Sequence, residues 1–245
     1  MKKIMILTFL AGMLLLTGCV SVTLGGGGGV NALRGTGSMT TREFNVANFT
    51  GINIEGEFHV VYRQSATHNV RVHMHENLFE ILQVNTNNDV LQVSTTRPTR
   101  TNRGYTPRVY IYAPILETVN LSGAINAAEW DTVLGSRFDV TVAGAVSAEM
   151  SLEVETVEIH VAGAGDFTLS GSAESANITL TGAGNVEAED LQTKNAQVII
   201  SGAGNVVIAA SDTLSVTISG AGRVYYVGNP QVSRTIAGFG SVQQR

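Results

Sequence analysis

The sequence contains little cysteine, proline or charge. Its single cysteine among 245 residues, Cys19, excludes an intramolecular disulfide framework, so packing must stabilise the fold. The four prolines lie outside residues 115–229, as expected where every strand must donate ladder hydrogen bonds. Only 14% of residues are charged and the net charge is −5, which does not favour a nucleic-acid partner.

Recognisable catalytic motifs are also missing. The sequence has no Gly-x-Ser-x-Gly elbow, no His-Glu-x-x-His motif and no group of zinc-binding cysteines. We therefore predict no enzyme activity, no cofactor and no metal site. His73 and His75 could begin a metal site because residues i and i+2 share one face of a strand, but a solvated strand face is the favoured interpretation.

The N-terminus has the pattern of a bacterial lipoprotein signal. Lys2 and Lys3 precede a 13-residue apolar run and then Leu16-Thr17-Gly18-Cys19, which is similar to a lipobox. The resemblance implies that residues 1–18 are removed and that Cys19 carries a lipid. Five glycines, Gly25 to Gly29, follow in a segment without periodicity, so we predict a flexible tether over residues 19–43 and one domain over residues 44–245.

Glycine recurs at nearly equal intervals through the second half of the chain. The spacings are 21, 19, 19, 20, 18 and 18 residues, for Gly123, Gly144, Gly163, Gly182, Gly202, Gly220 and Gly238. A period near 20 is typical of a solenoid. We expect these glycines to supply a positive φ at a corner, and the alanine that follows most of them to point into the bend.

Apolar residues form columns in phase with these glycines, at two and four positions before and four positions after each. Because residues i and i+2 share one face of a strand, these columns should point inward. The sequence therefore predicts an all-β fold, a right-handed parallel β-helix with 18–21 residues per coil. The strands predicted before residue 115 are less regular, with a hairpin turn at Asn87-Asn88-Asp89, and we expect them to cap one end.

Several segments resemble a known family. They are NFTGINIEGEFHVVYRQ, NDVLQVS, VYIYAPILETVNLSGA and the repeated Ser-Gly-Ala-Gly. Together they are similar to the head GIN domain of auto-transporter adhesins, a bacterial domain of unknown function named for a motif present here as Gly51-Ile52-Asn53. The resemblance covers roughly residues 44–227. It implies a right-handed β-helical fold on an exported lipoprotein and supplies no catalytic residues.

A basic segment, TTRPTRTNRGYTPR, is the main candidate binding site. It has no acidic residue and places cations near one aromatic ring, at Arg97, Arg100, Arg103, Tyr105 and Arg108. Arginine suits sulfate, phosphate or uronate groups, and tyrosine can stack on a sugar ring. A solvated loop is the alternative interpretation.

Asp139, Glu158 and His160 form a second candidate, on the outer face of adjacent coils. Carboxylates one coil apart could serve as an acid and base pair of a carbohydrate-active enzyme. A ladder of charges between neighbouring coils is the favoured interpretation.

Three functions remain open. The favoured one is a non-enzymatic, lipid-anchored protein of the bacterial cell envelope, more consistent with the outer membrane, that acts in adhesion or glycan binding. The second is a carbohydrate-active enzyme. The third is an envelope scaffold that docks another subunit, or another copy, on its last coil near Val242.

Overall fold

The computed structural model describes residues 32–100 and 105–245. The predicted signal peptide, Cys19 and the glycine run lie outside the described residues, and so does Arg103. Within the described ranges, no helix is long and apolar enough to cross a membrane.

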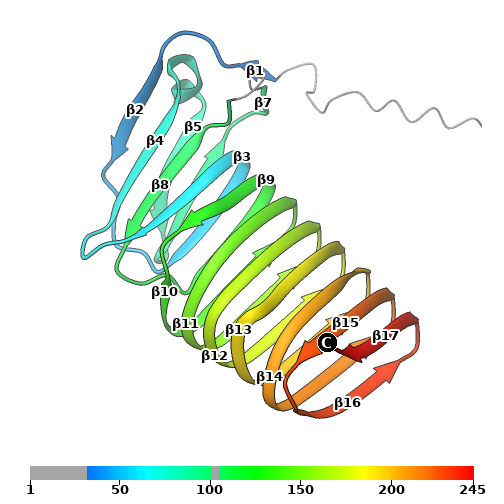
Figure 1. The fold of residues 1–245 in the computed structure, drawn as a ribbon. Helices are drawn as coiled ribbons and strands as arrows, with labels where there is room; N and C mark the ends of the chain where they lie inside the picture. Colours follow the sequence, from blue (N-terminus) through cyan, green and yellow to red (C-terminus); the bar gives the residue numbers. More distant parts are fainter. Residues whose placement is uncertain (1–31, 101–104) are drawn as a thin grey trace, which may run out of the picture.

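The second half of the chain is a parallel β-solenoid (Figure 1). Each of its strands pairs in parallel with its counterparts in the neighbouring coils, for example Ala145 with Ala164 and Ala164 with Ala183. This confirms the predicted β-helix and its repeat. The strands are β9 (Thr118–Trp130), β10 (Val133–Val142), β11 (Ala145–Val161), β12 (Ala164–Leu180), β13 (Ala183–Ile200), β14 (Ala203–Ile218), β15 (Ala221–Val227), β16 (Gln231–Ile236) and β17 (Phe239–Gln244).

The predicted apolar columns fill the solenoid interior. In the column two residues before the glycines, all members from Leu121 to Ile218 are at most 1% exposed, and the column four residues after is buried from Ala127 to Val242. The last coil is the exception, since Ile236 is 40% exposed and Arg234 is exposed. Burial of these stacked columns supplies the main stabilisation of a domain without disulfides.

The corner glycines are required for space, which corrects the expectation of a positive φ. Among the seven, only Gly123 has a φ in the left-handed region, at 104°. At the other six, a Cβ atom would lie 1.8 to 2.0 Å from the carbonyl oxygen of the corner glycine one coil before. The glycines therefore form a ladder in which successive backbones approach too closely for any side chain.

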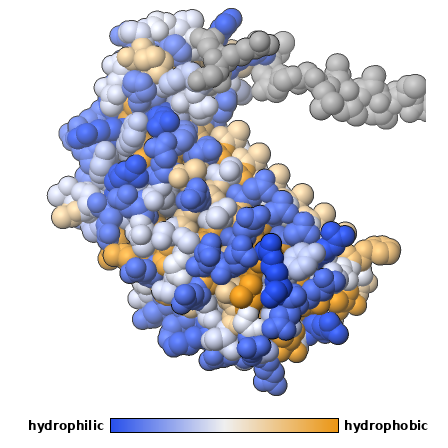
Figure 2. All heavy atoms as spheres, viewed as in Figure 1, coloured by the Kyte–Doolittle hydropathy of each residue, from blue (hydrophilic) through white to orange (hydrophobic). Residues whose placement is uncertain are grey.

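The corner alanines point outward, so the prediction that they point into the bend was wrong. All six are exposed: Ala124, Ala145, Ala164, Ala183, Ala203 and Ala221. We call them the alanine row. Figure 2 shows a row of apolar atoms along this edge of the solenoid.

Unequal coil lengths are absorbed away from this corner. The Gly-Ala register is unbroken between coils, whereas the pairing of β12 with β13 shifts between Thr168 and Ser170. The pairing of β13 with β14 shifts between Ala188 and Gln192 and again between Thr193 and Asn195. These irregularities keep the ladder aligned although the repeat varies.

The N-terminal half caps one end of the solenoid. β3 (Gly51–Gln64) pairs in parallel with β9 on one side and with β6 (Val90–Thr95) and β8 (Arg108–Ala113) on the other. Beyond β8 the pairing becomes antiparallel, through β4 (Asn69–His75) to β2 (Met39–Phe44), as Figure 1 shows. A 3-10 helix (Glu76–Glu80) connects β4 to β5 (Leu82–Asn87).

Two local predictions for this half have different outcomes. The hairpin turn between β5 and β6 is confirmed, with φ of 50° at Asn88 and 59° at Asp89, as a type I′ turn requires. The predicted tether is too long, because β2 lies almost entirely within it. A two-residue strand of the same segment, β1 (Leu33–Arg34), pairs with β7 (Thr99–Arg100). Pairing with later strands orders a segment whose composition alone indicates flexibility.

Candidate functional site

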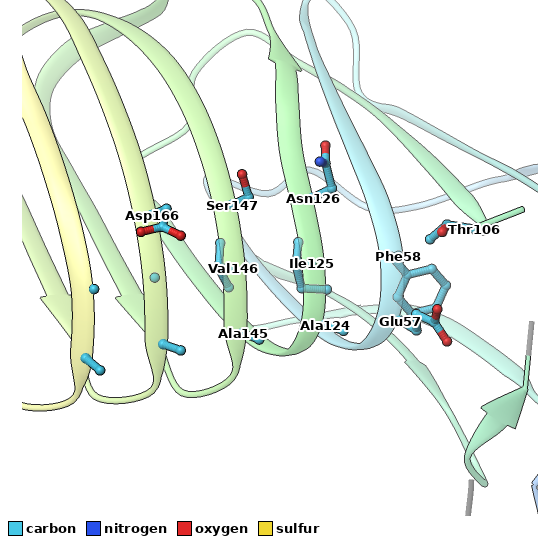
Figure 3. Close-up of a pocket in the computed structure, with 14 residues that line it drawn as sticks. Glu57, Phe58, Thr106, Ala124, Ile125, Asn126, Ala145, Val146, Ser147 and Asp166 are labelled. Carbon is cyan, nitrogen blue, oxygen red and sulfur yellow. The ribbon is translucent and has the colours of Figure 1, made fainter. Parts of the chain in front are cut away.

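The Gly-Ala corner carries a shallow groove on the outside of the solenoid (Figure 3). One wall is the part of the alanine row from Ala124 to Ala183. The other is formed by Asn126, Ser147 and Asp166, which begin a row of residues two positions further along each strand. This row continues beyond the groove, and we call the whole of it the polar row: Asn126, Ser147, Asp166, Asn185, Asn205, Arg223 and Ser241. Glu57, Phe58 and Thr106 line the groove at the capped end. Because the alanines are small, a ligand can approach the backbone closely along this edge.

The polar row is partly organised by hydrogen bonds between coils. Asn185 Nδ2 donates to Asp166 Oδ1 at 2.9 Å, and Asn205 Nδ2 donates to Asn185 Oδ1 at 3.0 Å. Strand neighbours lie about 4.8 Å apart, so each coil presents one polar side chain at a fixed interval. The row therefore offers a regular series of amide, hydroxyl and carboxylate groups to an extended ligand.

A second hollow lies at the other end of the same corner. It is lined by residues of the last three coils, among them Asn205, Arg223, Phe239 and Ser241. Phe239 is 90% exposed. It occupies the position that alanine holds in every earlier solenoid coil, since it pairs with Ala221.

The described residues of the predicted arginine site come from three places in the capped end. Arg97 is exposed in the bend before β7, and Arg100 is exposed on β7 beside β1. Arg108 begins β8 between β3 and β4, where its Nη1 lies 3.2 Å from Glu129 Oε1. Whether they act together in binding stays a prediction.

Tyr105 is fixed within the protein. Its hydroxyl donates to the carbonyl of His73 at 2.6 Å, and its ring packs edge-on against His73 and His75. Burial, the largest cause, and the nearby Tyr110 raise the pKa of Tyr105 to about 12. A hydroxyl already committed to a backbone carbonyl is less available to a ligand than the sequence suggested.

The two histidines of β4 have separate partners. His73 Nδ1 lies 2.9 Å from the Thr41 hydroxyl, and His75 Nδ1 lies 3.1 Å from the Gly37 carbonyl oxygen. In the part of the chain that the structure describes, no group of three or more His, Cys, Asp or Glu residues is arranged to hold a metal ion.

A half-buried histidine, His59, lies on β3, which is separated from β4 by β8. His59 Nε2 is 3.1 Å from Glu129 Oε1, the same oxygen that binds Arg108. Burial, followed by repulsion from Arg108, lowers the pKa of His59 although Glu129 acts in the opposite direction. The neutral imidazole is therefore favoured in the folded state.

The carboxylates of the second candidate site are joined by an arginine. Arg137 Nε lies 2.8 Å from Asp139 Oδ2, and Arg137 Nη2 lies 3.1 Å from Glu158 Oε2. Asp139 and Glu158 are paired in register on adjacent coils, and His160 Nε2 is 3.9 Å from Glu158. The sequence predicted a ladder of charges between neighbouring coils. In the structure Arg137, which that prediction did not include, bridges the two carboxylates.

Sequence reasoning also missed two residues of the corner. Gly56 precedes the seven glycines as the first rung, because its carbonyl oxygen lies 2.1 Å from the position of a Cβ at Gly123. The sequence did contain a signal for Gly56. Ile52 and Ile54 lie four and two positions before it and Val60 lies four positions after it, as in the apolar columns around the other glycines. Phe239 could have been found as the bulky residue that replaces alanine after the last of the seven glycines.

Comparisons with known proteins agree on one family and one fold. The family described as "Putative auto-transporter adhesin, head GIN domain" matches residues 48–230. No curated protein matches the chain.

Solved structures share the fold at low sequence identity. A putative adhesin from Bacteroides fragilis superposes with a TM-score of 0.81 at 21% identity, covering 87% of this chain and 100% of that one. A putative adhesin from Parabacteroides merdae gives 0.63 at 23% identity, covering 87% and 99%. A structure from Parabacteroides distasonis named as a putative lipid binding protein gives 0.64 at 19% identity, also covering 87% and 99%.

Proposed function

Because the chain belongs to the family of the putative auto-transporter adhesin head GIN domain, we propose that it is a surface-interaction protein of the bacterial cell envelope that binds carbohydrate along its Gly-Ala corner. The lipobox-like segment ending at Cys19 supports attachment to a membrane through a lipid, with the outer membrane favoured. In this proposal the solenoid is the part presented to a ligand.

The observation that carries the proposal is the pairing of the alanine row with the polar row. The alanines leave room for a sugar ring, and the polar row supplies hydrogen-bond donors and acceptors of the kind that recognise hydroxyl groups. Two coils span about 10 Å, a length suited to successive sugar units of an extended chain. A regular polymer would thus meet equivalent groups at regular intervals.

Binding without cleavage is favoured by the state of the outer carboxylates. Arg137 contacts both Asp139 and Glu158, so each carboxylate is already engaged in an ion pair within the protein. The two carboxylates also lie outside the residues that line the groove. We therefore expect the protein to hold a glycan and leave it intact.

A groove-filling substitution tests this function. Full-length protein, purified in mild detergent, is screened against envelope and host glycans for both binding and cleavage. Ala164→Trp places a large ring in the groove, whereas Ala162→Trp, also at an exposed position of the same corner, lies outside the groove lining. We expect a bound glycan whose affinity falls at least tenfold with Ala164→Trp and stays within twofold with Ala162→Trp.

Two outcomes would contradict the proposal. The absence of binding to every glycan, or equal binding by both tryptophan variants, would remove the groove as a carbohydrate site. Cleavage of the bound polymer that is lost in Asp139→Ala or Glu158→Ala would establish the enzymatic alternative instead.

A further inference from the structure

The last two coils each depart from the repeat once at the corner. Phe239 stands where the earlier solenoid coils have alanine, and Arg223 stands in the polar row where the two preceding coils have asparagine. Both side chains are exposed and both line the hollow at this end. The two departures therefore fall on one site.

Phe239 has the exposure of a binding platform. Its neighbours along the row show that alanine satisfies the corner geometry, so the fold does not require a large ring there. Figure 2 shows that the apolar edge of the solenoid continues to this end of the molecule. An exposed aromatic face at the end of a groove can pack against the apolar face of a sugar ring.

Arg223 supplies a positive charge without a partner of its own. The sequence contains no Asp or Glu from Thr213 to Arg245. Among the described residues the ion pair at this end joins Arg245 to Glu189, and Arg223 takes part in none. A free guanidinium beside the ring can bind a carboxylate or sulfate through two parallel hydrogen bonds.

The register places these two groups at a suitable separation. Ala221 pairs with Phe239, and Arg223 pairs with Ser241, so the ring and the guanidinium are diagonal neighbours on adjacent strands. Diagonal positions lie about 7 to 8 Å apart, within reach of two long side chains. Asn205 and Ser241 complete the lining with an amide and a hydroxyl.

We propose that the last two coils form a subsite for an acidic sugar, in which Phe239 packs against the pyranose ring and Arg223 binds its carboxylate or sulfate. This inference rests on the proposed carbohydrate-binding function and specifies its ligand. The groove selects an extended glycan, and the terminal subsite selects for negative charge.

The test compares acidic glycans with neutral counterparts. The probes are oligogalacturonate and its methyl ester, and dextran sulfate and dextran, measured on the full-length protein in detergent at two salt concentrations. Phe239→Ala and Arg223→Asn restore the residues of the earlier coils. Ile236→Ala and Arg234→Asn are matched controls, because they remove an exposed apolar group and an exposed charge from β16, which lies between Arg223 and Phe239 in the chain.

The expected results differ for the two substitutions. The unchanged protein should prefer at least one acidic probe over its neutral counterpart by tenfold or more, with affinity falling as salt increases. Arg223→Asn should abolish this preference and most of the salt dependence, and Phe239→Ala should weaken binding about tenfold, the effect typical of losing one aromatic stacking partner. The two β16 controls should behave as the unchanged protein.

The failures of this inference and of the proposed function can be separated. If Ala164→Trp abolishes glycan binding while Phe239→Ala and Arg223→Asn do not alter it, the groove functions and the subsite is refuted. If no glycan binds, the proposed carbohydrate-binding function and the subsite are both refuted. If Phe239→Ala converts a dimer to a monomer in light scattering and leaves acidic-glycan binding unchanged, the ring is a contact between two copies and the subsite is refuted.

Discussion

The glycine ladder predicts a sharp difference between two glycines of the same corner. A Cβ at Gly163 would lie 2.0 Å from the carbonyl oxygen of Gly144, a backbone atom of the preceding coil. A Cβ at Gly165 would lie 2.8 Å from Phe167 Cε2 and 3.1 Å from Val161 Cγ1, which are side-chain atoms that can shift. Neither glycine has a positive φ, so alanine is compatible with the backbone at both positions.

The cost of Gly163→Ala follows from this geometry. The Gly144 oxygen must retreat by about 1.5 Å to restore van der Waals contact. It also accepts a hydrogen bond from Ala164 N at 2.8 Å, which such a movement would break. Overpacking of about 1 to 3 kcal/mol and a lost hydrogen bond of about 1 kcal/mol give an expected destabilisation of about 2 to 4 kcal/mol.

Gly165→Ala should cost about 1 kcal/mol, less than Gly163→Ala, because only side chains need to move. The equivalent positions two coils and one coil before hold Ile125 and Val146. In those coils the residue two positions further is an alanine, so at Gly165 the Phe167 ring must shift to admit the methyl group. Urea unfolding followed by far-ultraviolet circular dichroism measures both variants. Equal losses of stability in the two variants would refute the steric explanation of the ladder.

Three further predictions concern the capped end. Tyr105→Phe should remove a phenol that ionises near pH 12 in an absorbance titration near 295 nm. Because the folded pKa of Tyr105, about 12, exceeds the unfolded value of 10, its contribution to stability is present below pH 10 and is lost as pH rises toward 12. The folded pKa of His59 lies below 6.5, so the stability that comes from the neutral imidazole is present above pH 6.5 and is lost as pH falls through the folded pKa. Nuclear magnetic resonance should show this histidine titrating below its ordinary range. Glu129→Gln should lower the pKa of His59 further by removing the only opposing charge, and an unchanged titration would exclude Glu129 as its partner.

The repeated half of the fold was predictable because its spacing is nearly constant. When apolar columns recur with each glycine, only one register buries all of them, and the pairing of Val140 with Ile159 and of Ile159 with Ile178 follows. The alternation of side chains along a strand also places the alanines outside. Each alanine lies three positions before the inward column at Phe167 and its equivalents, and therefore faces the opposite way. The prediction that the alanine points inward was wrong because the chain turns at the glycine itself and leaves the next side chain outside.

The capped end was less predictable because its neighbours are far apart in sequence. Gly56 and Gly123 lie on adjacent coils, yet β4, β5, β6 and β8 intervene between them without a common period. The antiparallel pairing that orders β2 likewise depends on β4, which periodicity does not locate. Alternation indicates which face of a strand is buried but carries no information about its partner.

The candidate site was found only in part. The sequence directed attention to a basic segment, in which Arg100 lies on β7 and Arg108 on β8. It contained the informative departures at Arg223 and Phe239, but their proximity becomes visible only when the coils are stacked in register. Arg137 was overlooked because a pattern of carboxylates does not reveal which cation lies between them.

The position of the register shifts gives the solenoid one edge that tolerates changes in length and one that does not. An extra residue at the Gly-Ala corner would exchange inward and outward side chains along the following strand. An extra residue near Glu189 and Asp190 falls where the pairing is already irregular and both side chains are exposed. Descendants of this protein, natural or designed, can therefore acquire new loops on the tolerant edge while the Gly-Ala edge keeps its spacing.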